Sequence, residues 1–398
     1  MDITIQPSLL QGDISIIPSK SQAHRLLICA AFADRPTTLI CPQTNEDIQA
    51  TAVCLNALGA QIQRVDTGYQ VIPISVLPEK ADLPCGESGS TLRFLLPIVG
   101  ALGVKGCFHM KGRLPARPLS PLWEEMERMG CCLSRPTEDT LRCTGKLRNG
   151  IYSIGGNVSS QFVSGLLFAA ALLHGNSEIQ IQGTLESAPY VYMTRQALLQ
   201  FGCAIHDYRI MGNQKLRSPG EISVEGDWSN GAFFLAANAL GSQIRIHGLN
   251  MASLQGDRLI TEILPRMEDF TTISAANIPD LVPILSIAAA SKKGAVFTDI
   301  RRLRLKESDR VATVIAMLHA LGIHAEATDN AFTVHPGIFR SGCVDTANDH
   351  RIAMSAAIAA TIATGPVTIL GCQCVNKSFP GFWKEYKHLG GQYEQYIR

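Results

Sequence analysis

The sequence has almost no excess of charge of either sign. Its 398 residues include 35 lysines and arginines against 34 aspartates and glutamates, which gives a formal net charge of +1. A protein that binds nucleic acid or an anionic membrane surface over a broad face needs an excess of basic residues, so this balance argues against both classes. Any anion-binding region must therefore be a local concentration of basic residues.

The sequence also lacks the cysteine and histidine spacings of common metal sites. Its twelve cysteines are scattered and form no CxxC pair, and its ten histidines form no HExxH motif. Metal sites and disulfide frameworks both need cysteines or histidines at recurring short spacings. We therefore expect reduced thiols in a cytoplasmic protein and no bound metal.

Long apolar runs are absent as well. The apolar stretches that we expect to be helical run for about 13 to 16 residues, below the ~20 that a transmembrane helix needs. The opening residues Met-Asp-Ile-Thr-Ile contain neither the basic segment nor the apolar segment of a secretory signal. We therefore expect a protein that is neither exported nor associated with a membrane.

What the sequence does contain is one pattern repeated six times. Each copy begins with a polar cluster, continues with an apolar helix, a glycine and a short strand, and in most copies adds a second helix and alternating strands. We expect an α/β (α+β) fold of two domains, each with three roughly βαβαββ units around buried central helices. The polar clusters begin near Ser21, Gly89, Ser159, Ser229, Asp280 and Asp349.

Local signals add detail to this pattern. The stretch IHAEATDNAFTVHP (323–336) alternates on both sides of Asp329-Asn330, which predicts a hairpin. The fourth and fifth clusters are 51 residues apart, whereas the other spacings are 68 to 70 residues. Because the shortened segment follows Met267, we expect the fifth unit to have a compressed hairpin. Gly226-Asp227, halfway along the chain, is the expected domain junction.

Basic and hydroxyl residues gather where the helices are expected to begin. Helix N-termini carry partial positive charge and free N–H groups, and therefore bind anions. A single residue of this kind is usually a surface charge or a helix cap, and GESGSTLR (86–93) lacks the lysine of a P-loop. Their recurrence in several units nevertheless predicts a site for a ligand with several negative charges. These residues are Lys20, Ser21, Arg25, Ser90, Arg93, Ser159, Ser160, Gln161, His350 and Arg351, with Arg117, Lys306, Arg310 and Lys377 in expected loops.

Acidic residues lie among these bases. Asp280 follows Pro279 at an expected helix start, and Glu307 and Asp309 lie within RLKESDR. An acid in a cationic site can transfer protons if its pKa is suitable, but an acid beside arginines can also simply pair with them. Both interpretations remain open from the spacing alone.

A set of short motifs falls in a fixed order along nearly the whole chain. Each motif is weak alone, but the ordered set resembles the 5-enolpyruvylshikimate-3-phosphate synthase family. The motifs are Pro18-Ser-Lys-Ser21 with Arg25, GESGSTLR, Arg117-Pro118, Ser159-Ser-Gln161, Ser187-Ala-Pro-Tyr190, Gly226-Asp227, Ser253-Leu-Gln-Gly-Asp257, Ile278-Pro-Asp280, Arg304-Leu-Lys-Glu-Ser-Asp-Arg310, Asn348-Asp-His-Arg351 and Lys377-Ser-Phe-Pro380.

The resemblance implies a fold and an activity. One domain would hold residues 14–225 and the other residues 1–13 with 226–398, with the active site in the cleft between them. The implied reaction transfers the enolpyruvyl (carboxyvinyl) group of phosphoenolpyruvate to the 5-hydroxyl of shikimate 3-phosphate and releases phosphate, a step of chorismate and aromatic amino-acid biosynthesis. It needs no metal or organic cofactor. We expect these small-molecule substrates, no nucleic acid or membrane partner, and a monomer.

The resemblance also implies roles for the matching residues. Asp280 would take the proton of the 5-hydroxyl, and Glu307, helped by Lys20 or Lys377, would protonate the methylene of phosphoenolpyruvate. The residues implied for shikimate 3-phosphate are Lys20, Ser21, Arg25, Ser159, Ser160, Gln161, Ser187, Tyr190, Asp280 and Lys306. The residues implied for phosphoenolpyruvate are Lys20, Gly89, Arg93, Arg117, Gln161, Arg310, His350, Arg351 and Lys377.

The sequence departs from the family pattern at four positions. His24, Glu87 and Arg302 stand where relatives often have asparagine, and Ser90 replaces a common threonine. Of these, the changes at Glu87 and Arg302 bear on ligand affinity. Gly89 is retained where a larger residue would crowd the phosphoenolpyruvate site, so we expect inhibition by glyphosate.

Two other functions fit parts of the same pattern. The enolpyruvyl transferase that acts on UDP-N-acetylglucosamine shares the implied fold, but it typically has a reactive cysteine in the loop that matches residues 111–118, where this chain has none. An inactive phospho-ligand or RNA-binding repeat protein could use the same units. It would need a basic outer face, and it would have no use for Asp280 and Glu307.

Overall fold

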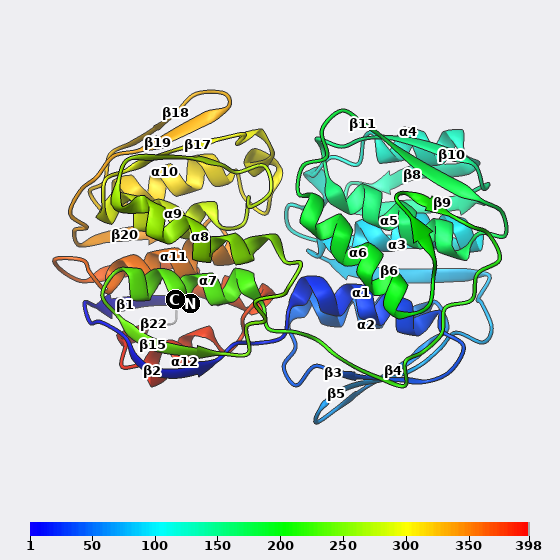
Figure 1. The fold of residues 1–398 in the computed structure, drawn as a ribbon, viewed down its shortest axis with the longest axis horizontal. Coiled ribbons are helices and arrows are strands. Elements are labelled where there is room, and N and C mark those ends of the chain that lie inside the picture. Colours follow the sequence, from blue (N-terminus) through cyan, green and yellow to red (C-terminus); the bar gives the residue numbers. More distant parts are fainter. Residues whose placement is uncertain (397–398) are drawn as a thin grey trace. The chain divides into compact units, whose positions relative to one another are not determined.

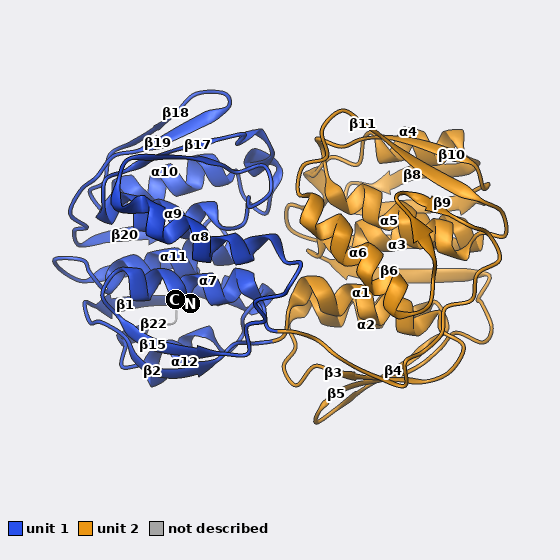
Figure 2. Cartoon of the chain, viewed as in Figure 1, with its two compact units in different colours: residues 1–17, 226–398 blue, residues 18–225 orange. Residues whose placement is uncertain are grey.

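The computed structural model describes residues 1–396, which form two compact units (Figure 2). Unit 1 holds residues 1–17 and the chain from Gly226 onward, and unit 2 holds Pro18–Glu225. Residues 14–17, which the sequence analysis groups with 18–225, therefore belong to unit 1. The reason is that β2 (Gln11–Ser15) pairs in parallel with β15 (Gln243–His247), so a boundary after residue 13 would divide a strand.

Unit 2 contains three four-stranded sheets with the same strand order. In each sheet, two parallel strands are followed by an antiparallel hairpin. In spatial order the sheets are β14 (Glu221–Ser223), β3 (Thr37–Ile40), β5 (Gly68–Ile72) and β4 (Gln61–Val65); β6 (Lys80–Gly86), β7 (Lys105–Met110), β9 (Thr140–Gly145) and β8 (Cys131–Thr137); and β10 (Ile151–Gly155), β11 (Ser177–Gln182), β13 (Arg209–Ile210) and β12 (Ile205–His206).

Each of these sheets has two helices. Figure 1 shows α1, α3 and α5 lying between strands β3–β5 below them and strands β8–β11 above them. The helices of unit 2 are α1 (Lys20–Ala31), α2 (Glu46–Ala57), α3 (Gly89–Leu102), α4 (Leu122–Arg128), α5 (Ser160–Leu172) and α6 (Ala188–Gln200), with a short 3-10 helix η1 (Leu114–Ala116).

Unit 1 repeats this arrangement with one incomplete sheet, which consists of β2 and β15 alone. Its complete sheets are β16 (Thr271–Ser274), β17 (Ala295–Thr298), β19 (Ala331–Val334) and β18 (Ala325–Ala327), and β20 (Gly342–Asp345), β21 (Val367–Leu370), β1 (Asp2–Gln6) and β22 (Gln392–Tyr396). Its helices are α7 (Trp228–Ala239), α8 (Ile260–Ile263), α9 (Val282–Ser291), α10 (Arg310–Ala320), α11 (His350–Ala360) and α12 (Phe382–His388). Its 3-10 helices are η2 (Gly256–Leu259), η3 (Leu264–Glu268), η4 (Arg301–Leu305) and η5 (Cys372–Lys377).

The missing hairpin belongs to the fourth unit of the repeat and not to the fifth, which corrects the sequence analysis. After η3 the chain enters β16 at once, without the two antiparallel strands that the other units have. The fifth unit has a complete hairpin, in which Ala325 pairs with Val334 and Ala327 pairs with Phe332. The hairpin expected around Asp329-Asn330 is therefore confirmed, and the spacing of 51 residues reflects the two-stranded sheet β2–β15.

The central helices are enclosed because they are apolar on all sides. Every residue of α11 is buried, and so is every residue of α9 except its last. Each unit has its own continuous core of buried apolar side chains. This confirms the expected α/β fold with buried central helices. Within residues 1–396, no helix has both the length and the apolar character that crossing a membrane requires.

Charged side chains of these helices lie near their beginnings, and the polar side chains further along are small, such as Ser164, Ser286 and Ser355. At each of seven helix starts, a side-chain oxygen accepts a hydrogen bond from a backbone N–H two or three residues further on, which satisfies a donor that the helix itself leaves free. Because the rest of each central helix is surrounded by apolar side chains, its N-terminus is where charged groups can gather. The capping residues are Ser19, Asn45, Ser88, Ser159, Asp227, Asp309 and Asp349.

Gly165 sets how closely α3 and α5 approach each other. A methyl group on Gly165 would lie 2.2 Å from the carbonyl oxygen of Arg93, a backbone atom that cannot move without shifting α3. We expect Gly165→Ala to lower the free energy of unfolding of unit 2 by about 1–3 kcal/mol, because overpacking forces two buried helices apart. Urea unfolding followed by circular dichroism measures this loss. The matched control is Gly381→Ala, whose methyl group would meet only Phe379 at 3.8 Å. Equal unfolding midpoints for the two variants would contradict the packing argument.

Candidate functional site

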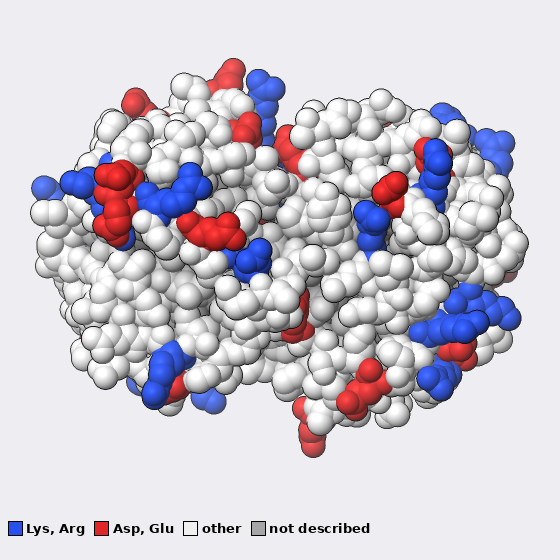
Figure 3. Space-filling model, in the orientation of Figure 1, with Lys and Arg blue, Asp and Glu red and all other residues white. Residues whose placement is uncertain are grey.

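The residues selected from the sequence form a charged cluster in each unit. In unit 2 they come from the starts of α1, α3, α5 and α6 and from the residue after η1. In unit 1 they come from the segment before α9, from residues 306–310, from the start of α11 and from the end of η5. On the face drawn in Figure 3, exposed lysines and arginines are mixed with aspartates and glutamates. The concentrated charge of the clusters is therefore not part of a broad basic surface on that face.

Arg93 connects the starts of α3 and α5 in unit 2. Its side chain is buried, and its guanidinium donates to Oε1 of Gln161 at 3.1 Å and to the carbonyl oxygen of Pro118 at 3.2 Å. The same group lies over the ring of Phe162 at 5.7 Å. Gln161 in turn donates to Oγ of Ser90 at 2.9 Å. The structure thus brings Arg93 and Gln161, both selected from the sequence, into direct contact.

Two arginines converge on Gly89, the first residue of α3. A methyl group on Gly89 would lie 2.7 Å from an Nη1 atom of both Arg93 and Arg117. The N–H groups at the start of α3 add partial positive charge to this place. Two guanidinium groups at a helix N-terminus can bind the oxygens of a phosphate or a carboxylate. The absence of a side chain at Gly89 lets both guanidinium groups approach the start of α3 this closely.

Arg25 is held by the protein itself. It is 2% exposed, its Nε donates to the hydroxyl of Thr194 at 2.8 Å, and its Nη atoms donate to the carbonyl oxygens of Ser21 at 2.6 Å and Tyr190 at 2.7 Å. Burial lowers the pKa of Arg25 to about 10. Because these bonds connect α1 to α6, Arg25 positions the backbone of Ser21 and Tyr190.

The other selected residues of unit 2 also lie at helix starts. Lys20, the first residue of α1, forms an ion pair with Asp47 at 3.0 Å. Ser159 caps α5, and Ser160 beside it is buried. Ser187, which is also buried, has a left-handed backbone with φ of 54°. This conformation is costly for a residue with a side chain and is found most often at functional sites.

His24, one of the departures from the family pattern, begins a buried chain of hydrogen bonds. Its Nδ1 lies 2.7 Å from the hydroxyl of Thr51, which lies 2.6 Å from the hydroxyl of Thr91, and Thr91 donates to Ser88 at 2.7 Å. Burial and the nearby charge of Lys20 lower the pKa of His24 well below its ordinary value, so the imidazole is neutral. The chain ends at the serine that caps α3 and supports the start of that helix.

In unit 1 the centre of the cluster is Arg310, which is 1% exposed. Its Nε contacts Asp349 at 2.9 Å, one Nη contacts Glu307 at 2.5 Å, and the other Nη is bonded to Asp280. Burial alone would lower the pKa of Arg310, but the three carboxylates outweigh burial and raise that pKa well above its ordinary value. Both acids selected for proton transfer are thus ion partners of one arginine in this structure.

Asp280 contacts two further cations. It lies before α9, which begins at Val282, and it pairs with Arg351 at 3.2 Å and with Lys306 at 3.5 Å. Burial would raise the pKa of Asp280, but the surrounding cations hold it well below its ordinary value. Burial also lowers the pKa of Lys306 to about 8. Asp280 is therefore a carboxylate within a group of three basic side chains.

The remaining residues of the unit 1 cluster lie at the start of α11 or contact the residues just before it. Lys377, at the end of η5, donates to the carbonyl oxygen of Asn348 at 2.9 Å. His350 is buried, and its Nδ1 lies 3.9 Å from the carboxylate of Asp349. Together with Arg351, these contacts bring all of the unit 1 residues selected from the sequence into one connected group.

Two buried acids of unit 1 were not selected from the sequence. Asp349 caps α11 and also accepts from the hydroxyl of Ser308 at 3.0 Å. Asp257 accepts from the hydroxyl of Ser229, and burial and the charge of Asp280 raise the pKa of Asp257 to about 6. The available signals were an aspartate directly before an expected helix and an aspartate inside a family motif. Neither signal says that these acids neighbour Arg310 and Asp280.

Two other departures lie near the clusters. Arg302 is 8% exposed, and its charge contributes to the lowered pKa of Lys306, so Arg302 neighbours the unit 1 cluster. A Cβ atom on Gly112 would lie 2.5–2.8 Å from the carboxylate group of Glu87, which places that carboxylate against the loop that leads to Arg117.

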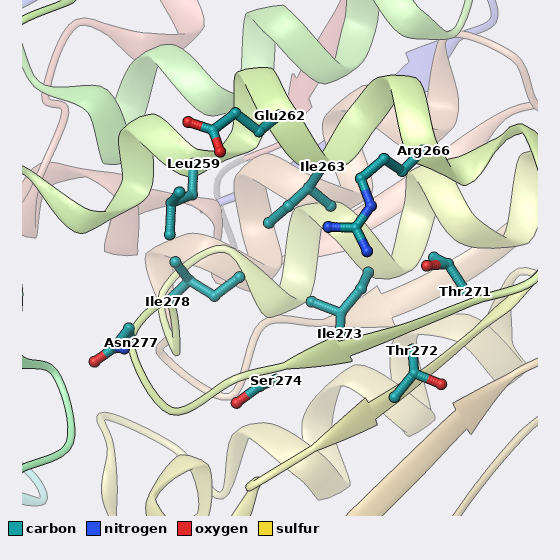
Figure 4. Close-up of a pocket in the computed structure, with 10 residues that line it drawn as sticks. All are labelled: Leu259, Glu262, Ile263, Arg266, Thr271, Thr272, Ile273, Ser274, Asn277 and Ile278. Carbon is teal, nitrogen blue, oxygen red and sulfur yellow. The ribbon is translucent and has the colours of Figure 1, made fainter.

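A cavity of about 260 Å³ in unit 1 contains none of the selected residues. It lies between residues 259–266 and the segment that starts with β16, where the fourth unit lacks its hairpin. Figure 4 shows Arg266 reaching toward the isoleucines at its centre. Its lining residues are Leu259, Glu262, Ile263, Arg266, Thr271, Thr272, Ile273, Ser274, Asn277 and Ile278.

Asp349→Asn keeps a capping side chain but removes the charge that pairs with Arg310. We expect it to lower the free energy of unfolding of unit 1 by about 2–4 kcal/mol at pH 7, because a buried cation loses one charged partner. The loss is limited because Asp280 and Glu307 still contact Arg310 and the asparagine can still cap α11. Arg310 and His350 outweigh burial and lower the pKa of Asp349 below its ordinary 3.8. The stabilising charge is therefore fully present above pH 3.8 and is lost as the pH falls through the lower folded-state pKa.

Denaturant unfolding of the wild type and Asp349→Asn at pH 7 and pH 3 checks this expectation. The difference in stability between the two proteins should be smaller at pH 3. The matched control is Asp309→Asn, because Asp309 caps α10 but its carboxylate is 38% exposed and pairs with Arg304 at 3.5 Å. A difference of equal size at both pH values would rule out the ion pair as its origin.

Comparison with known proteins shows similarity over the whole chain. The profile of the EPSP synthase (3-phosphoshikimate 1-carboxyvinyltransferase) family matches residues 5–278 and 268–386. A 3-phosphoshikimate 1-carboxyvinyltransferase from Clostridium acetobutylicum is 38% identical to this chain. The alignment covers 99% of this chain and 98% of that protein. A protein of the same name from Clostridium perfringens is 37% identical over 98% of each chain.

Solved structures share the fold. EPSP synthase from Acinetobacter baumannii matches with a TM-score of 0.79 at 23% identity, over 99% of this chain and 100% of that chain. The enolpyruvyl transferase NikO from Streptomyces tendae matches with a TM-score of 0.78 at 17% identity, over 99% and 98% of the two chains. The fold and the whole-length sequence match agree: this chain belongs to the EPSP synthase (3-phosphoshikimate 1-carboxyvinyltransferase) family.

Proposed function

We propose that this chain transfers the carboxyvinyl group of phosphoenolpyruvate to the 5-hydroxyl of shikimate 3-phosphate and releases phosphate, in the pathway to chorismate and the aromatic amino acids. Its relatives over the whole length bear the name of this transferase. The observation in the structure that carries the proposal is the convergence of Arg93 and Arg117 on Gly89 at the start of α3. Such a place suits the phosphate or carboxylate of a small substrate.

The substrates explain why the chain needs two charged clusters. Phosphoenolpyruvate and shikimate 3-phosphate each carry one carboxylate and one phosphate, so four anionic groups must be bound together. Arginine binds such groups with two parallel hydrogen bonds, and lysine binds them as a point charge. We assign to each substrate the residues that the family resemblance implies for it.

Formation of the tetrahedral intermediate needs two proton transfers. We assign Asp280 to accept the proton of the 5-hydroxyl, and Glu307, assisted by Lys20 or Lys377, to protonate C3 of phosphoenolpyruvate. The hydroxyl oxygen then bonds to C2 and gives a tetrahedral intermediate. Glu307, now deprotonated, removes a proton from the C3 methyl group while the bond between C2 and the phosphate oxygen breaks. This restores the double bond, and the departing phosphate takes the proton held by Asp280.

The ion pairs of unit 1 suggest how the acids become active. Asp280 and Glu307 contact Arg310, and the low pKa of Asp280 makes it a poor proton acceptor in this state. A substrate phosphate or carboxylate that binds Arg351 or Lys306 would compete with Asp280 for these cations. Its negative charge would also raise the pKa of Asp280. Asp280 would then become an effective base only when the anionic substrates are bound.

The compartment, the oligomeric state and the cofactor requirement of the enzyme are also part of what we propose. We assign it to the cytoplasm as a monomer that needs no metal or organic cofactor for this reaction, because every step is a proton transfer or an addition–elimination. All twelve cysteines are free thiols, which fits a reducing compartment.

The test of this function is phosphate release from phosphoenolpyruvate with two acceptors in parallel. Release with shikimate 3-phosphate and none with UDP-N-acetylglucosamine is the expected result. Release only with the nucleotide sugar would keep the fold and overturn the substrate. Release with neither acceptor, from a folded sample, would favour an inactive phospho-ligand or RNA-binding protein.

Asp280→Asn and Glu307→Gln keep the shape of each side chain but remove its capacity to transfer a proton. We expect each change to lower kcat by about 10²–10⁴-fold, the usual contribution of a general acid or base. Steady-state phosphate release measures the effect. Asp309→Asn is the matched control, since Asp309 caps α10 and pairs with Arg304. If Asp280→Asn and Glu307→Gln were as active as this control, the assignment of the acids would fail.

Gly89→Ala tests the space beside the two arginines of unit 2. Its methyl group would displace Arg93 and Arg117, so we expect the KM for phosphoenolpyruvate to rise by about 10-fold or more. The KM for shikimate 3-phosphate should change little and serves as an internal control. Glyphosate should inhibit the wild type and should inhibit Gly89→Ala more weakly. A variant with an unchanged KM for phosphoenolpyruvate would place that substrate elsewhere.

A further inference from the structure

The hairpin of the fifth unit carries two histidines and a glutamate outside the charged clusters. His324 directly precedes β18, Glu326 lies in β18, and His335 directly follows β19. Residues at alternate positions of a strand point to the same face of the sheet. Ala325 and Val334 are buried in the core of unit 1, so His324, Glu326 and His335 lie on the opposite, outer face.

The register of the hairpin brings the three side chains together. The strands pair Ala325 with Val334, and the backbone N–H of His335 donates to the carbonyl oxygen of His324 at 3.0 Å, so the two histidines are directly opposite. Their rings stack with centroids 4.8 Å apart. One nitrogen of each ring and one oxygen of Glu326 lie within 4.8 Å of one another.

The ring nitrogens are available to a ligand. Nε2 of His335 is shielded from solvent and makes no hydrogen bond to any residue that the structure describes. It lies 3.5 Å from a carboxylate oxygen of Glu326. A shielded nitrogen without a hydrogen bond is unfavourable, and a cation placed between it and the carboxylate would satisfy both groups.

A third histidine supports this arrangement without joining it. The ring of His319, in the last turn of α10, stacks on His324 with an angle of 2° between the planes. Its Nε2 lies 2.9 Å from the carbonyl oxygen of Ala325, to which it can donate. His319 is therefore engaged with the backbone and restricts the ring of His324. Groups that orient a ligand in this way strengthen metal sites.

We propose that His324, Glu326 and His335 bind a late first-row divalent cation, of which Zn²⁺ is the best match. Two imidazoles and one carboxylate are the ligands that zinc uses in three-ligand sites, with water in the fourth position, whereas Mg²⁺ and Ca²⁺ prefer oxygen ligands alone. Zinc binds nitrogen and oxygen at about 2.0–2.2 Å in tetrahedral geometry, so two ligand atoms on one ion are about 3.4 Å apart. Rotation of these side chains would close the remaining distance from 4.8 Å.

The ion would act on the hairpin and not on the reaction. β18 is the three-residue edge strand of its sheet, and a metal held from both strands would tie it to β19. His319 and Arg310 are at opposite ends of α10, about 13 Å apart along the helix. Zinc bound here should therefore stabilise unit 1 and leave phosphate release unchanged.

The test is calorimetric titration of the whole, chelator-treated chain with ZnCl2. We expect one site whose affinity falls at least about tenfold in His335→Gln and in Glu326→Gln, since each variant lacks one of three ligands. Thr333→Ala, in β19 opposite Glu326, is the matched control for changes to the hairpin surface. Circular dichroism confirms that each variant is folded. Zinc affinity in His335→Gln equal to that of the wild type would overturn the proposal.

A second cluster of possible ligands, Asp82, Cys107 and His109, requires its own control. Its histidine is already paired with Asp82 at 3.0 Å. His109→Gln should therefore keep the zinc site, and Co²⁺ bound to the chain should show no thiolate charge-transfer band. Loss of the site in His109→Gln, or a thiolate band, would place the metal at Cys107 instead.

Two further measurements separate this proposal from the proposed function. Zinc at a hundredfold excess over its Kd should raise Tm by about 5 °C in the wild type and not in His335→Gln. Removal of zinc with EDTA should leave the rate of phosphate release unchanged. A chain that lost phosphate release with EDTA and regained it with zinc would contradict the structural role, whereas a chain inactive in every condition would count only against the proposed function.

Discussion

The structure depends on the need to enclose helices that have no polar face. A helix such as α9 or α11 cannot lie on a surface, because every side of it would expose apolar side chains to water. Each unit meets this need with sheets and outer helices packed around its central helices. Polar groups are then excluded from most of the length of these helices and collect at their beginnings. The position of both charged clusters follows from this packing.

The two clusters balance their charges differently. The hydrogen bonds described for Arg25 and Arg93 in unit 2 go to neutral oxygens. Arg310 in unit 1 is surrounded by carboxylates. In the mechanism we propose, the arginines of unit 2 bind substrate anions, and the acids of unit 1 transfer protons. The same type of repeat would then supply both kinds of site.

Features that follow from local rules could be predicted from the sequence. The repeat, the caps Ser159 and Asp349 and the hairpin at Asp329-Asn330 depend on neighbours in the chain. The other helix starts lie one or two residues away from the expected positions, at Ser19, Ser88 and Asp227. The ion pair of Arg310 with Asp349 and the hydrogen bonds of Arg25 to Thr194 and Tyr190 depend on how distant helices pack, so no local pattern predicts them. The zinc ligands are an intermediate case. His324 and His335 are equidistant from the predicted turn, and extending the hairpin register by one pair would have found them.

The first strand of the chain gives unit 1 an unusual construction. β1 lies between β21 and β22, so residues 2–6 complete a sheet whose other strands all come from the last 60 residues. Unit 2 is one continuous segment that is synthesised after β1 and before the strands that pair with β1. Unit 2 can therefore fold before β1 has its partners. The same pairing places Asp2 opposite Tyr396. The two ends of the described chain are therefore adjacent, and a short linker could join them while new termini open in a surface loop.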